Sequence, residues 1–328
     1  GDLEGIRIKL PYLREMGVDY LYLNPIFEAH SNHRYNTADY LNVDPLLGTN
    51  EEFEVLCREA AKYGIGIVLD GVFSHTGSDS RYFNREGRYG EGGAYRDPNS
   101  PYRSWYDFDP KYKGGYRSWW GFETLPEVNE ETPSFVEFIT GEGGVIDTWL
   151  RRGAAGFRLD VADELPDAFI EKIRTAVKRV SPEKFLLGEV WEDATTKFGF
   201  DHRRTYLLGK GLDSVMNYPF KNSVLDFVKG KPAQQAANEI LSICEHYPAP
   251  AINTALNFLS THDTERALTV IADEPANGRG REWQSGRSVT GEAYEEGMLR
   301  LRMAYAIIYT LPGVPCLYYG DEIGMQGY

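Results

Sequence analysis

The chain has 328 residues, of which 42% are hydrophobic and 26% are charged, an ordinary composition for a globular protein. Its formal net charge of −14 repels phosphate backbones, which disfavours a nucleic acid partner but not a neutral substrate such as a sugar. No apolar run approaches the ~20 residues that cross a bilayer, so we expect no membrane partner. The sparse, odd set of cysteines predicts buried thiols without disulfides and favours a reducing, cytoplasmic location: Cys57, Cys244 and Cys316.

Helical and strand-like patterns alternate in the first 70 residues. Apolar residues at helical spacing predict a helix over residues 3–16, and a strand follows over residues 18–23. A second helix is predicted over residues 50–63, with Thr49 or Asn50 as its N-cap. Residues 65–70 are almost wholly apolar, as expected for a parallel strand that is buried on both faces.

Residues 76–130 interrupt this alternation. They are rich in Gly, Tyr, Arg, Asp and Pro and show no clear periodicity, which predicts a long insertion between a strand and the helix that follows it. Their many aromatic residues favour an ordered subdomain over a flexible linker.

The alternation returns after residue 130. Helices are predicted over residues 134–152, 167–180, part of 223–246 and 294–310, and strands over residues 156–160, 185–189, 212–216, 255–260 and 314–319. Such a pattern predicts an α/β protein with a parallel sheet, and we expect a TIM-type (β/α)8 barrel with a long insertion after the third strand. The first strand would precede Gly1 and would be missing from this segment. The barrel would comprise residues 1–75 and 131–328, and residues 76–130 would be the inserted subdomain.

Four predicted strands end in, or lead into, a carboxylate. These residues are Asp70, Asp160, Glu189 and Asp263. The strands of a β/α barrel point their carboxyl ends at one mouth, where chemistry collects. Two or three carboxylates in one pocket indicate cleavage of a glycosidic bond.

Two of these carboxylates have neighbours that suit opposite roles. Arg158 lies two residues before Asp160, so both side chains point the same way, and we expect the arginine to lower the pKa of Asp160 and keep it ionised, as a nucleophile requires. Glu189 follows an apolar strand, where a carboxyl keeps its proton more readily, and this suits a general acid. Taken alone, each carboxylate would fit an ion pair or a helix cap equally well.

Other chemistries lack their motifs. No HExxH or CxxC spacing indicates zinc, and we predict no metal ligands within the chain and no required cofactor. The chain also has no Gly-x-Ser-x-Gly elbow, no P-loop and no dinucleotide fingerprint.

The motifs taken in order resemble one family. Segments that resemble the α-amylase superfamily, glycoside hydrolase family 13, are DGVFSH (70–75), GFRLDVADE (156–164), GEVWED (188–193), STHDTER (260–266) and GVPCLYYGDEIGMQG (313–327). NPIFEAHSNHRYNTADY (24–40) and WWGFETLPEVN (119–129) look most like the branch of neopullulanases, cyclomaltodextrinases and maltogenic amylases. Each motif is weak alone, but together they are specific and run nearly end to end.

The resemblance implies three catalytic residues. Asp160 would be the nucleophile that forms a covalent glycosyl-enzyme, and Arg158 would orient it. Glu189 would protonate the leaving oxygen and then activate water. Asp263 would hold sugar hydroxyls and stabilise the oxocarbenium-like transition state.

The resemblance also implies contacts with the substrate. Together with Arg158, the residues that would bind the sugar are Tyr35, His75, Trp191 and His262. Asp70 would be a supporting carboxylate near the site, and Glu164 would shape acceptor binding.

The implied activity is that of a retaining α-glucan hydrolase that cleaves α-1,4 glucosidic bonds of cyclodextrins, pullulan, maltooligosaccharides or starch, with α-1,6 bonds as an option. A conventional α-amylase or an α-glucosidase with transglycosylation is an alternative. A non-catalytic interaction subunit of the same fold is a further one, although such a protein is expected to lose the carboxylates that this chain keeps.

Departures from the family pattern bear on calcium. Ser74 stands where many α-amylases have an Asn that binds calcium in some of them, so we expect no calcium at this loop. In the resembling branch a calcium site lies around the first helix, where Asp2 would be the one remnant and most ligands would lie outside this segment. The branch also carries an N-terminal domain involved in dimers, which makes a homodimeric parent protein an option.

Overall fold

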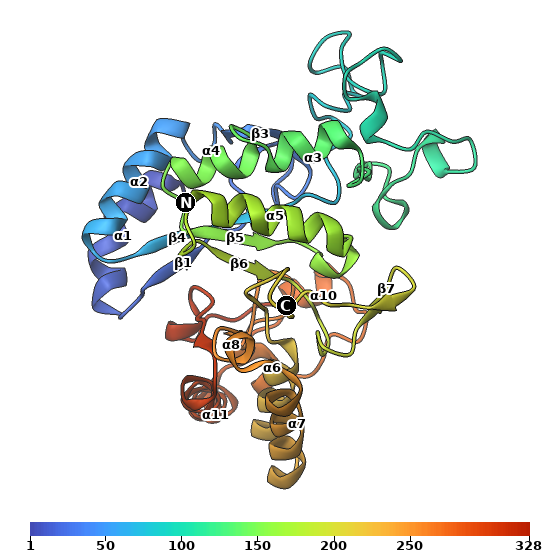
Figure 1. The fold of residues 1–328 in the computed structure, drawn as a ribbon. Coiled ribbons are helices and arrows are strands. Elements are labelled where there is room, and N and C mark those ends of the chain that lie inside the picture. The colour runs from blue at the N-terminus through green and yellow to red at the C-terminus, as the bar shows by residue number, and fades with distance from the viewer. The chain divides into compact units, whose positions relative to one another are not determined.

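A computed structural model describes residues 1–328, and the chain divides into two compact units (Figure 1). Unit 1 comprises Gly1–Glu189 and Lys210–Leu212, and unit 2 comprises Val190–Gly209 and Asp213–Tyr328. The elements of unit 1 are α1 (Leu3–Glu15), β1 (Tyr20–Tyr22), β2 (Phe27–Ala29), β3 (Thr37–Val43), α2 (Asn50–Lys62), β4 (Gly66–Gly71), η1 (Arg103–Trp105), η2 (Lys113–Gly115), η3 (Trp119–Gly121), α3 (Pro133–Thr140), α4 (Val145–Arg151), β5 (Gly156–Leu159), η4 (Ala162–Glu164), α5 (Asp167–Val180) and β6 (Phe185–Gly188). Those of unit 2 are β7 (Phe198–Gly199), β8 (His202–Arg203), β9 (Ser214–Val215), α6 (Tyr218–Val228), α7 (Ala233–His246), α8 (Ala249–Ile252), β10 (Leu256–Asn257), α9 (Ala267–Ala272), α10 (Arg281–Ser285), α11 (Gly291–Thr310), β11 (Val314–Pro315) and η5 (Asp321–Ile323).

Four parallel strands form the sheet of unit 1, in the order β1-β4-β5-β6. Every residue of β5 is buried, and in β4 only Gly66 is partly exposed. Helix α2 packs against β4 and helix α5 against β6, as expected where helices alternate with the strands of a parallel sheet. The predicted alternation of strand and helix is confirmed in this unit.

Helix α2 begins at a capping box. The Thr49 hydroxyl oxygen accepts a hydrogen bond from the Glu52 N–H at 3.2 Å, and the Glu52 carboxylate accepts one from the Thr49 N–H at 2.8 Å. Thr49 is therefore the N-cap. Asn50 has a different task, because its side-chain oxygen accepts a hydrogen bond from the Val43 N–H at the end of β3.

The single helix that the sequence predicts over residues 134–152 is two helices, α3 and α4, so that prediction was wrong. Three glycines lie between them: Gly141, Gly143 and Gly144. Gly143 has a φ of 72°, a left-handed conformation that glycine adopts without steric cost. The apolar spacing continues on both sides of the glycines, and this concealed the break.

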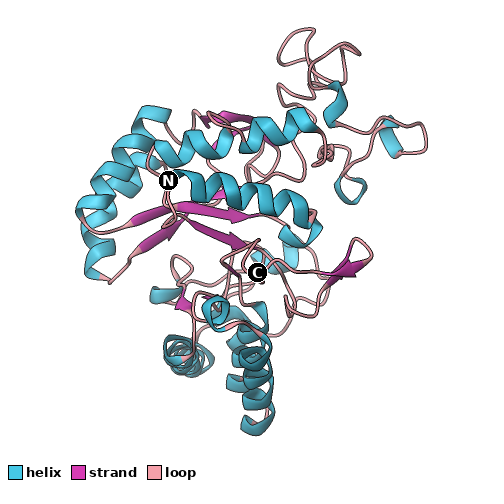
Figure 2. Cartoon of the chain, viewed as in Figure 1, coloured by secondary structure: helices cyan, strands magenta, loops and turns pink.

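Residues 76–130 contain short 3-10 turns joined by loops (Figure 2). Their aromatic rings pack on one another: the Phe83 ring centroid lies 4.7 Å from that of Tyr116 and 4.8 Å from that of Tyr106. The Arg103 guanidinium covers the Phe108 ring at 3.4 Å. The segment is therefore ordered, as its aromatic content predicts. It belongs to unit 1, and its assignment as a separate subdomain stays a prediction.

Two antiparallel hairpins were not predicted. Strand β2 pairs with β3, and β7 pairs with β8. Strand β2 has three residues and β7 and β8 have two each, which is too short for an alternating pattern to be recognised. Strand β3 has seven residues, but its first four are all buried, so it does not alternate.

Unit 2 is mainly helical. Helices α6, α9 and α11 enclose a buried apolar core that includes Val224, Leu268 and Leu301. Strand β10 pairs in parallel with β11, so the strands predicted over residues 255–260 and 314–319 are paired only over two residues each.

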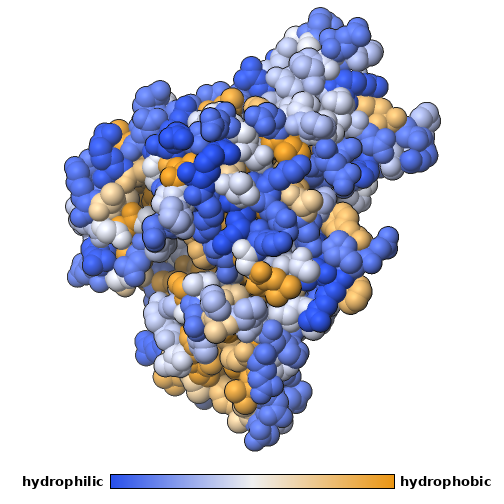
Figure 3. Space-filling model, in the orientation of Figure 1, coloured by the Kyte–Doolittle hydropathy of each residue, from blue (hydrophilic) through white to orange (hydrophobic).

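The visible surface is mostly hydrophilic, with apolar residues gathered over the helices of unit 2 (Figure 3). Exposed apolar side chains there are Leu241 of α7 and Leu299, Met303 and Tyr309 of α11. No helix is both long enough and apolar enough to cross a bilayer.

None of the cysteines forms a disulfide. Cys57 is buried, but Cys244 and Cys316 are partly exposed, so the prediction of three buried thiols was right only for Cys57.

Candidate active site

The centre of the candidate site is the guanidinium of Arg158. The sheet register places Arg158 of β5 opposite Asp70 of β4. Arg158 Nη1 donates to Asp70 Oδ1 at 2.9 Å and to Asp160 Oδ1 at 2.8 Å, and Nη2 lies 2.9 Å from Glu189 Oε2. We name these four residues the Arg158 cluster. Its members lie at the ends of three neighbouring strands, where the sequence predicted that carboxylates would meet.

Two tyrosine hydroxyls complete the hydrogen bonds of Asp70. Tyr22 and Tyr35 both donate to Asp70 Oδ2, at 2.7 Å and 2.8 Å. Tyr35 was predicted to lie in the site, and Tyr22 was missed. The available signal was its position: Tyr22 is the last residue of β1, as the acidic residues close the strands that follow. Asp70 is thus held in place by hydrogen bonds from Arg158 and from the two tyrosines.

Asp160 is 7% exposed and shares its arginine with two other carboxylates. Burial raises the pKa of Asp160 well above its usual value; Arg158 acts against this, and the Asp70 and Glu189 carboxylates add to it. The predicted lowering of this pKa by Arg158 was therefore wrong in its net direction. A single buried guanidinium cannot neutralise three carboxylates, and the sequence showed only the nearest of them.

Glu189 is buried, but its surroundings are not purely apolar. Besides the ion pair with Arg158, its Oε2 accepts a hydrogen bond from the Val161 N–H at 2.9 Å. Val161 follows Asp160 directly and has a φ of 40°, a strained conformation for a β-branched residue. This strained residue therefore connects the backbone beside Asp160 to the carboxylate of Glu189. Strain of this kind is found where a site must be held in one geometry.

His75 is 2% exposed, and both of its ring nitrogens have partners within the protein. Nε2 lies 3.0 Å from the Tyr35 carbonyl oxygen, which can only accept, so Nε2 carries the proton and Nδ1 accepts from the Ser74 hydroxyl at 2.9 Å. Burial lowers the pKa of His75 to about 4, so the ring is neutral at pH 7. Its predicted contact with a sugar hydroxyl stays a prediction, because that contact would replace one of these bonds.

Glu164 lies in η4, four residues after Asp160, and holds two tryptophans of the 76–130 segment. The indole N–H of Trp119 donates to Glu164 Oε2 at 2.6 Å, and that of Trp120 donates to Oε1 at 2.9 Å. The Trp119 ring centroid lies 5.6 Å from that of His75. The 76–130 segment is thereby fixed to the backbone that carries Asp160.

The remaining predicted residues belong to unit 2. His262 Nε2 and Asp263 Oδ2 lie 3.1 Å apart. The Trp191 ring stacks on Tyr218, with centroids 4.1 Å apart and 17° between the planes. Unit 1 thus brings together Asp70, Asp160, Glu189, Arg158, Tyr35, His75 and Glu164. The roles of Trp191, His262 and Asp263 stay predictions.

Asp2, the remnant that the resemblance implied for a calcium site, caps helix α1. Its Oδ1 accepts a hydrogen bond from the Gly5 N–H at 2.7 Å. No group of three or more His, Cys, Asp or Glu in the chain is arranged to hold a metal ion.

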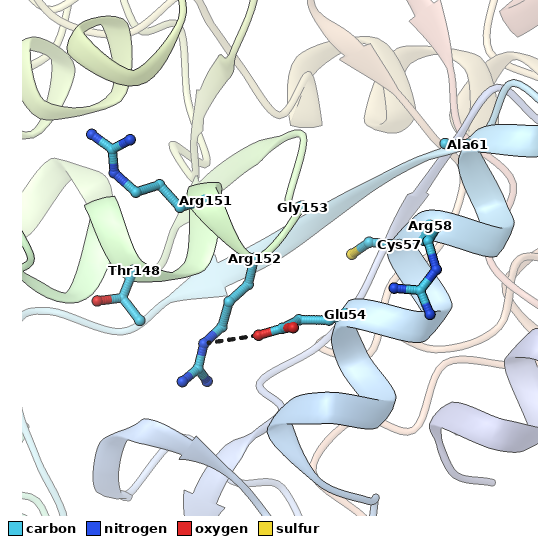
Figure 4. A pocket seen from close by; sticks show the side chains of 8 residues that line it. All are labelled: Glu54, Cys57, Arg58, Ala61, Thr148, Arg151, Arg152 and Gly153. Carbon is cyan, nitrogen blue, oxygen red and sulfur yellow. Dashed lines mark ion pairs between the residues drawn. The ribbon is translucent and has the colours of Figure 1, made fainter.

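A pocket of about 680 Å³ lies between helices α2 and α4 (Figure 4). Arg58 and Arg152 flank Glu54 there, and Arg152 lies 3.6 Å from the Glu54 carboxylate. The pocket shares no residue with the Arg158 cluster and holds no buried carboxylate pair. The cluster is therefore the candidate active site.

Comparisons with known proteins identify the family. The sequence model of one family, the α-amylase catalytic domain, matches residues 1–328. The chain belongs to this family, whose members share the TIM-barrel fold. The family consists of glycoside hydrolases, which is the class of enzyme that the sequence analysis predicted.

Several curated relatives match the whole chain. It is 37% identical to an amylopullulanase of Thermoanaerobacterium saccharolyticum, 34% identical to neopullulanase 2 of Thermoactinomyces vulgaris and 31% identical to a cyclomaltodextrinase of Geobacillus thermopakistaniensis. The chain spans 26% of the first of these proteins and 50% of each of the other two. The predicted resemblance to the neopullulanase and cyclomaltodextrinase branch is confirmed.

Solved structures give the same result. The cyclic α-maltosyl-(1→6)-maltose hydrolase of Arthrobacter globiformis superposes with a TM-score of 0.82 at 31% identity, over 100% of this chain and 66% of that one. The type III pullulan hydrolase of Thermococcus kodakarensis has a TM-score of 0.83 at 30% identity, over 100% of this chain and 53% of that one.

Proposed function

We propose that the protein is a retaining α-glucan hydrolase, which cleaves α-1,4 glucosidic bonds and also α-1,6 bonds. The observation that carries this proposal is the Arg158 cluster, in which Asp160 and Glu189 end neighbouring strands and pair with the same guanidinium. Retention needs two carboxyls ~5–5.5 Å apart, and adjacent strands lie ~4.8 Å apart, so the strand positions suit this mechanism.

The proposed reaction has two steps. An Asp160 oxygen bonds to the anomeric carbon as the bond to the leaving oxygen breaks, and Glu189 gives its proton to that oxygen. Water then attacks the anomeric carbon, Glu189 takes a proton from the water, and Asp160 leaves as a carboxylate. We assign Asp263 to the stabilisation of the positive charge that develops on the sugar ring, and His262 and Trp191 to substrate contacts.

The first step needs a charge on Asp160. Burial and the neighbouring Asp70 and Glu189 carboxylates raise the pKa of Asp160 and so act against that charge, whereas Arg158, whose Nη1 donates to Asp160 in a well-formed hydrogen bond, lowers the pKa and favours the ionised nucleophile.

The names of the relatives guide the choice of substrate. They include an amylopullulanase, a neopullulanase, a cyclomaltodextrinase and a hydrolase of a cyclic maltosyl-maltose. We therefore propose cyclodextrins, pullulan and maltooligosaccharides as substrates ahead of starch. A conventional α-amylase or an α-glucosidase with transglycosylation is the second candidate, because the same covalent intermediate can react with a sugar in place of water.

Two further proposals concern the parent protein. Strands β1, β4, β5 and β6 would form one side of a (β/α)8 barrel, with residues 76–130 as its insertion. The parent would work without a required cofactor, with calcium outside the chemistry, and a homodimer is its expected assembly.

Product analysis tests the proposed function. The full-length protein would be incubated with β-cyclodextrin, pullulan and soluble starch side by side, and the anomeric form of the first product would be followed by NMR. Maltose or panose from the first two substrates, released as the α-anomer, is the expected result. Fast cleavage of starch with little action on the other two would favour the α-amylase alternative, and release of the β-anomer would exclude retention.

A further inference from the structure

Tyr35 has partners at all three of its hydrogen-bonding groups. Its hydroxyl donates to Asp70 Oδ2 at 2.8 Å, and its carbonyl oxygen accepts a hydrogen bond from His75 Nε2 at 3.0 Å. Its N–H donates to His33 Nδ1 at 3.1 Å. The residue is therefore held at the Arg158 cluster from both ends, by the hydroxyl and by the backbone.

The residue before Tyr35 has a strained backbone. Arg34 has a φ of 63°, in the left-handed region that glycine adopts freely and other residues rarely adopt. It lies in the loop that joins β2 to β3. Because the backbone angles of one residue set the direction of the next, a change at Arg34 would move the Tyr35 ring away from Asp70. Strain of this kind persists only where surrounding contacts hold it.

A buried ion pair supplies the main contact. Arg34 Nε lies 3.0 Å from Asp44 Oδ2, and the two side chains are only 15% and 3% exposed. Asp44 is itself fixed, because its Oδ1 accepts a hydrogen bond from the Leu46 N–H at 2.9 Å. Its own N–H donates to the Ile26 carbonyl oxygen at 2.8 Å. The carboxylate therefore gives the guanidinium a rigid partner outside the loop, directly after β3.

Shorter contacts close the turn around Arg34. Its Nη1 donates to the Asn32 carbonyl oxygen at 3.1 Å, and its backbone N–H donates to Ser31 Oγ at 3.2 Å. The guanidinium thus connects the loop to Asp44. Glycine at position 34 would allow the same backbone conformation at less steric cost, so the arginine is explained by what its side chain holds in place.

The ion pair and the strained turn together have a consequence for the reaction. Resting on the proposed function, we propose that Arg34 is a positioning residue of the active site. Its ion pair with Asp44 holds the turn, and the turn places the ring and hydroxyl of Tyr35 at the Arg158 cluster, where Asp160 attacks the sugar. The contact with the substrate belongs to Tyr35, and Arg34 acts through it.

A double-mutant cycle in the full-length protein separates positioning from a general structural role. The kcat/KM on maltoheptaose would be measured for wild type, Arg34→Ala, Tyr35→Ala and the variant with both substitutions. We expect Arg34→Ala to lower kcat/KM about 20-fold in the wild-type background but less than about 3-fold in the Tyr35→Ala background, because a ring that is absent cannot be misplaced. Equal losses in the two backgrounds would overturn the proposal.

Two further variants test the ion pair itself. Lysine keeps a positive charge that can pair with Asp44, so Arg34→Lys should have a kcat/KM within about 3-fold of wild type. Arg34→Gly removes the ion pair but adopts the left-handed conformation freely, so it replaces Arg34→Ala if that variant does not fold, and it should lower kcat/KM in the same direction. A loss in Arg34→Lys as large as that in Arg34→Ala would overturn the role of the ion pair.

Arg81→Ala is the matched control. Arg81 pairs with Asp39, a buried aspartate of β3, so this variant also removes an arginine from an aspartate of the same hairpin. We expect its kcat/KM to stay within about 2-fold of wild type. A loss as large as that of Arg34→Ala would show that any missing ion pair on the hairpin has this effect, and would overturn the proposal.

A measurement without turnover distinguishes this proposal from the proposed function. A fluorinated tyrosine would be placed at position 35 of the full-length protein, and its fluorine NMR resonance would be recorded with Arg34, with Arg34→Lys and with Arg34→Ala. We expect one sharp resonance in the first two proteins and a shifted or broadened one in the third, even if the protein hydrolyses none of the glucans. A resonance that is unchanged in Arg34→Ala would overturn the positioning role while the proposed function stands.

Discussion

Two arginine–carboxylate groups in unit 1 differ in their surroundings. In the pocket between α2 and α4, Arg152 is 25% exposed and lies 3.6 Å from Glu54, whose side chain is 47% exposed. In the Arg158 cluster the arginine is 0% exposed and lies within 2.9 Å of three carboxylates. An exposed pair of the first kind contributes about 0–1 kcal/mol to stability, while burial of the second kind carries a large desolvation cost. The same two residue types therefore indicate a site only where they are buried.

The excess of negative charge in the cluster strengthens this conclusion. One guanidinium faces three carboxylates, and the pKa of Asp160 rises as a result of burial and of its two acidic neighbours. A fold has no structural need for such an excess, and strongly shifted groups of this kind concentrate at functional sites.

The largest expected effect is that of Asp160→Asn. A neutral amide cannot form the glycosyl-enzyme, so we expect kcat on maltoheptaose to fall by about 10⁴-fold or more while the dissociation constant for the sugar changes little. Steady-state kinetics and calorimetric binding would measure the two quantities. Turnover within about 10-fold of wild type would remove Asp160 from the role of nucleophile.

Glu189→Gln should have the next largest effect, and its size should depend on the substrate. Loss of a general acid lowers the rate by about 10²–10⁴-fold with natural glucans, whose leaving oxygen needs a proton. A maltosyl fluoride needs no such help, so its glycosylation step should be affected far less. Equal losses on the two substrates would contradict the acid role.

Arg158→Lys tests the cluster as a unit. A lysine supplies one point charge and cannot hold three carboxylates in the geometry of the guanidinium. We expect a loss of about 10²-fold in kcat and a decrease of about 3–5 kcal/mol in the free energy of unfolding, the range for a broken buried ion pair. Urea unfolding followed by fluorescence would measure the stability.

Arg152→Lys is the matched control for that variant, since it makes the same exchange beside Glu54 in the exposed pocket. The expected change in unfolding free energy is within about 0.5 kcal/mol, and kcat should stay at the wild-type value. If both variants behaved alike, burial would not explain the difference between the two groups.

Much of the site in unit 1 could be predicted because its carboxylates follow strands. A parallel sheet brings strand ends to one edge, so Asp70, Asp160 and Glu189 could be expected together from the chain order alone. The number of carboxylates on Arg158 could not be predicted, since it depends on register and on side-chain direction. For the same reason the direction of the Asp160 pKa shift was missed.

The structure of the irregular parts of the chain could be predicted less well from the sequence. The glycine break between α3 and α4 and the contact of Glu164 with two tryptophans depend on backbone angles and on long-range folding, which leave no periodic pattern. Trp119 and Glu164 lie 45 residues apart in the chain. Only the aromatic content of residues 76–130 indicated that this segment is ordered.

A buried acid that forms no ion pair with an arginine sharpens the comparison further. Glu130 is 8% exposed, and burial raises its pKa to about 8. The pKa of Glu130 is near 4.5 in the unfolded chain, so between pH 4.5 and pH 8 the folded state binds more protons at this residue than the unfolded state does. The contribution of Glu130 to stability is therefore complete below pH 4.5 and is lost as the pH rises through 8. Glu130→Gln should therefore make the protein more stable than wild type at pH 8.5 and flatten the decrease in unfolding free energy between pH 5 and pH 8.5. Urea unfolding of both proteins at the two pH values would measure the change in unfolding free energy with pH. The contribution of Asp160 to this change cancels in the comparison, because both proteins contain Asp160. Equal slopes would show that Glu130 is ionised in the folded state at little cost, and that a carboxylate can be buried here without the arginine that Asp160 and Glu189 share.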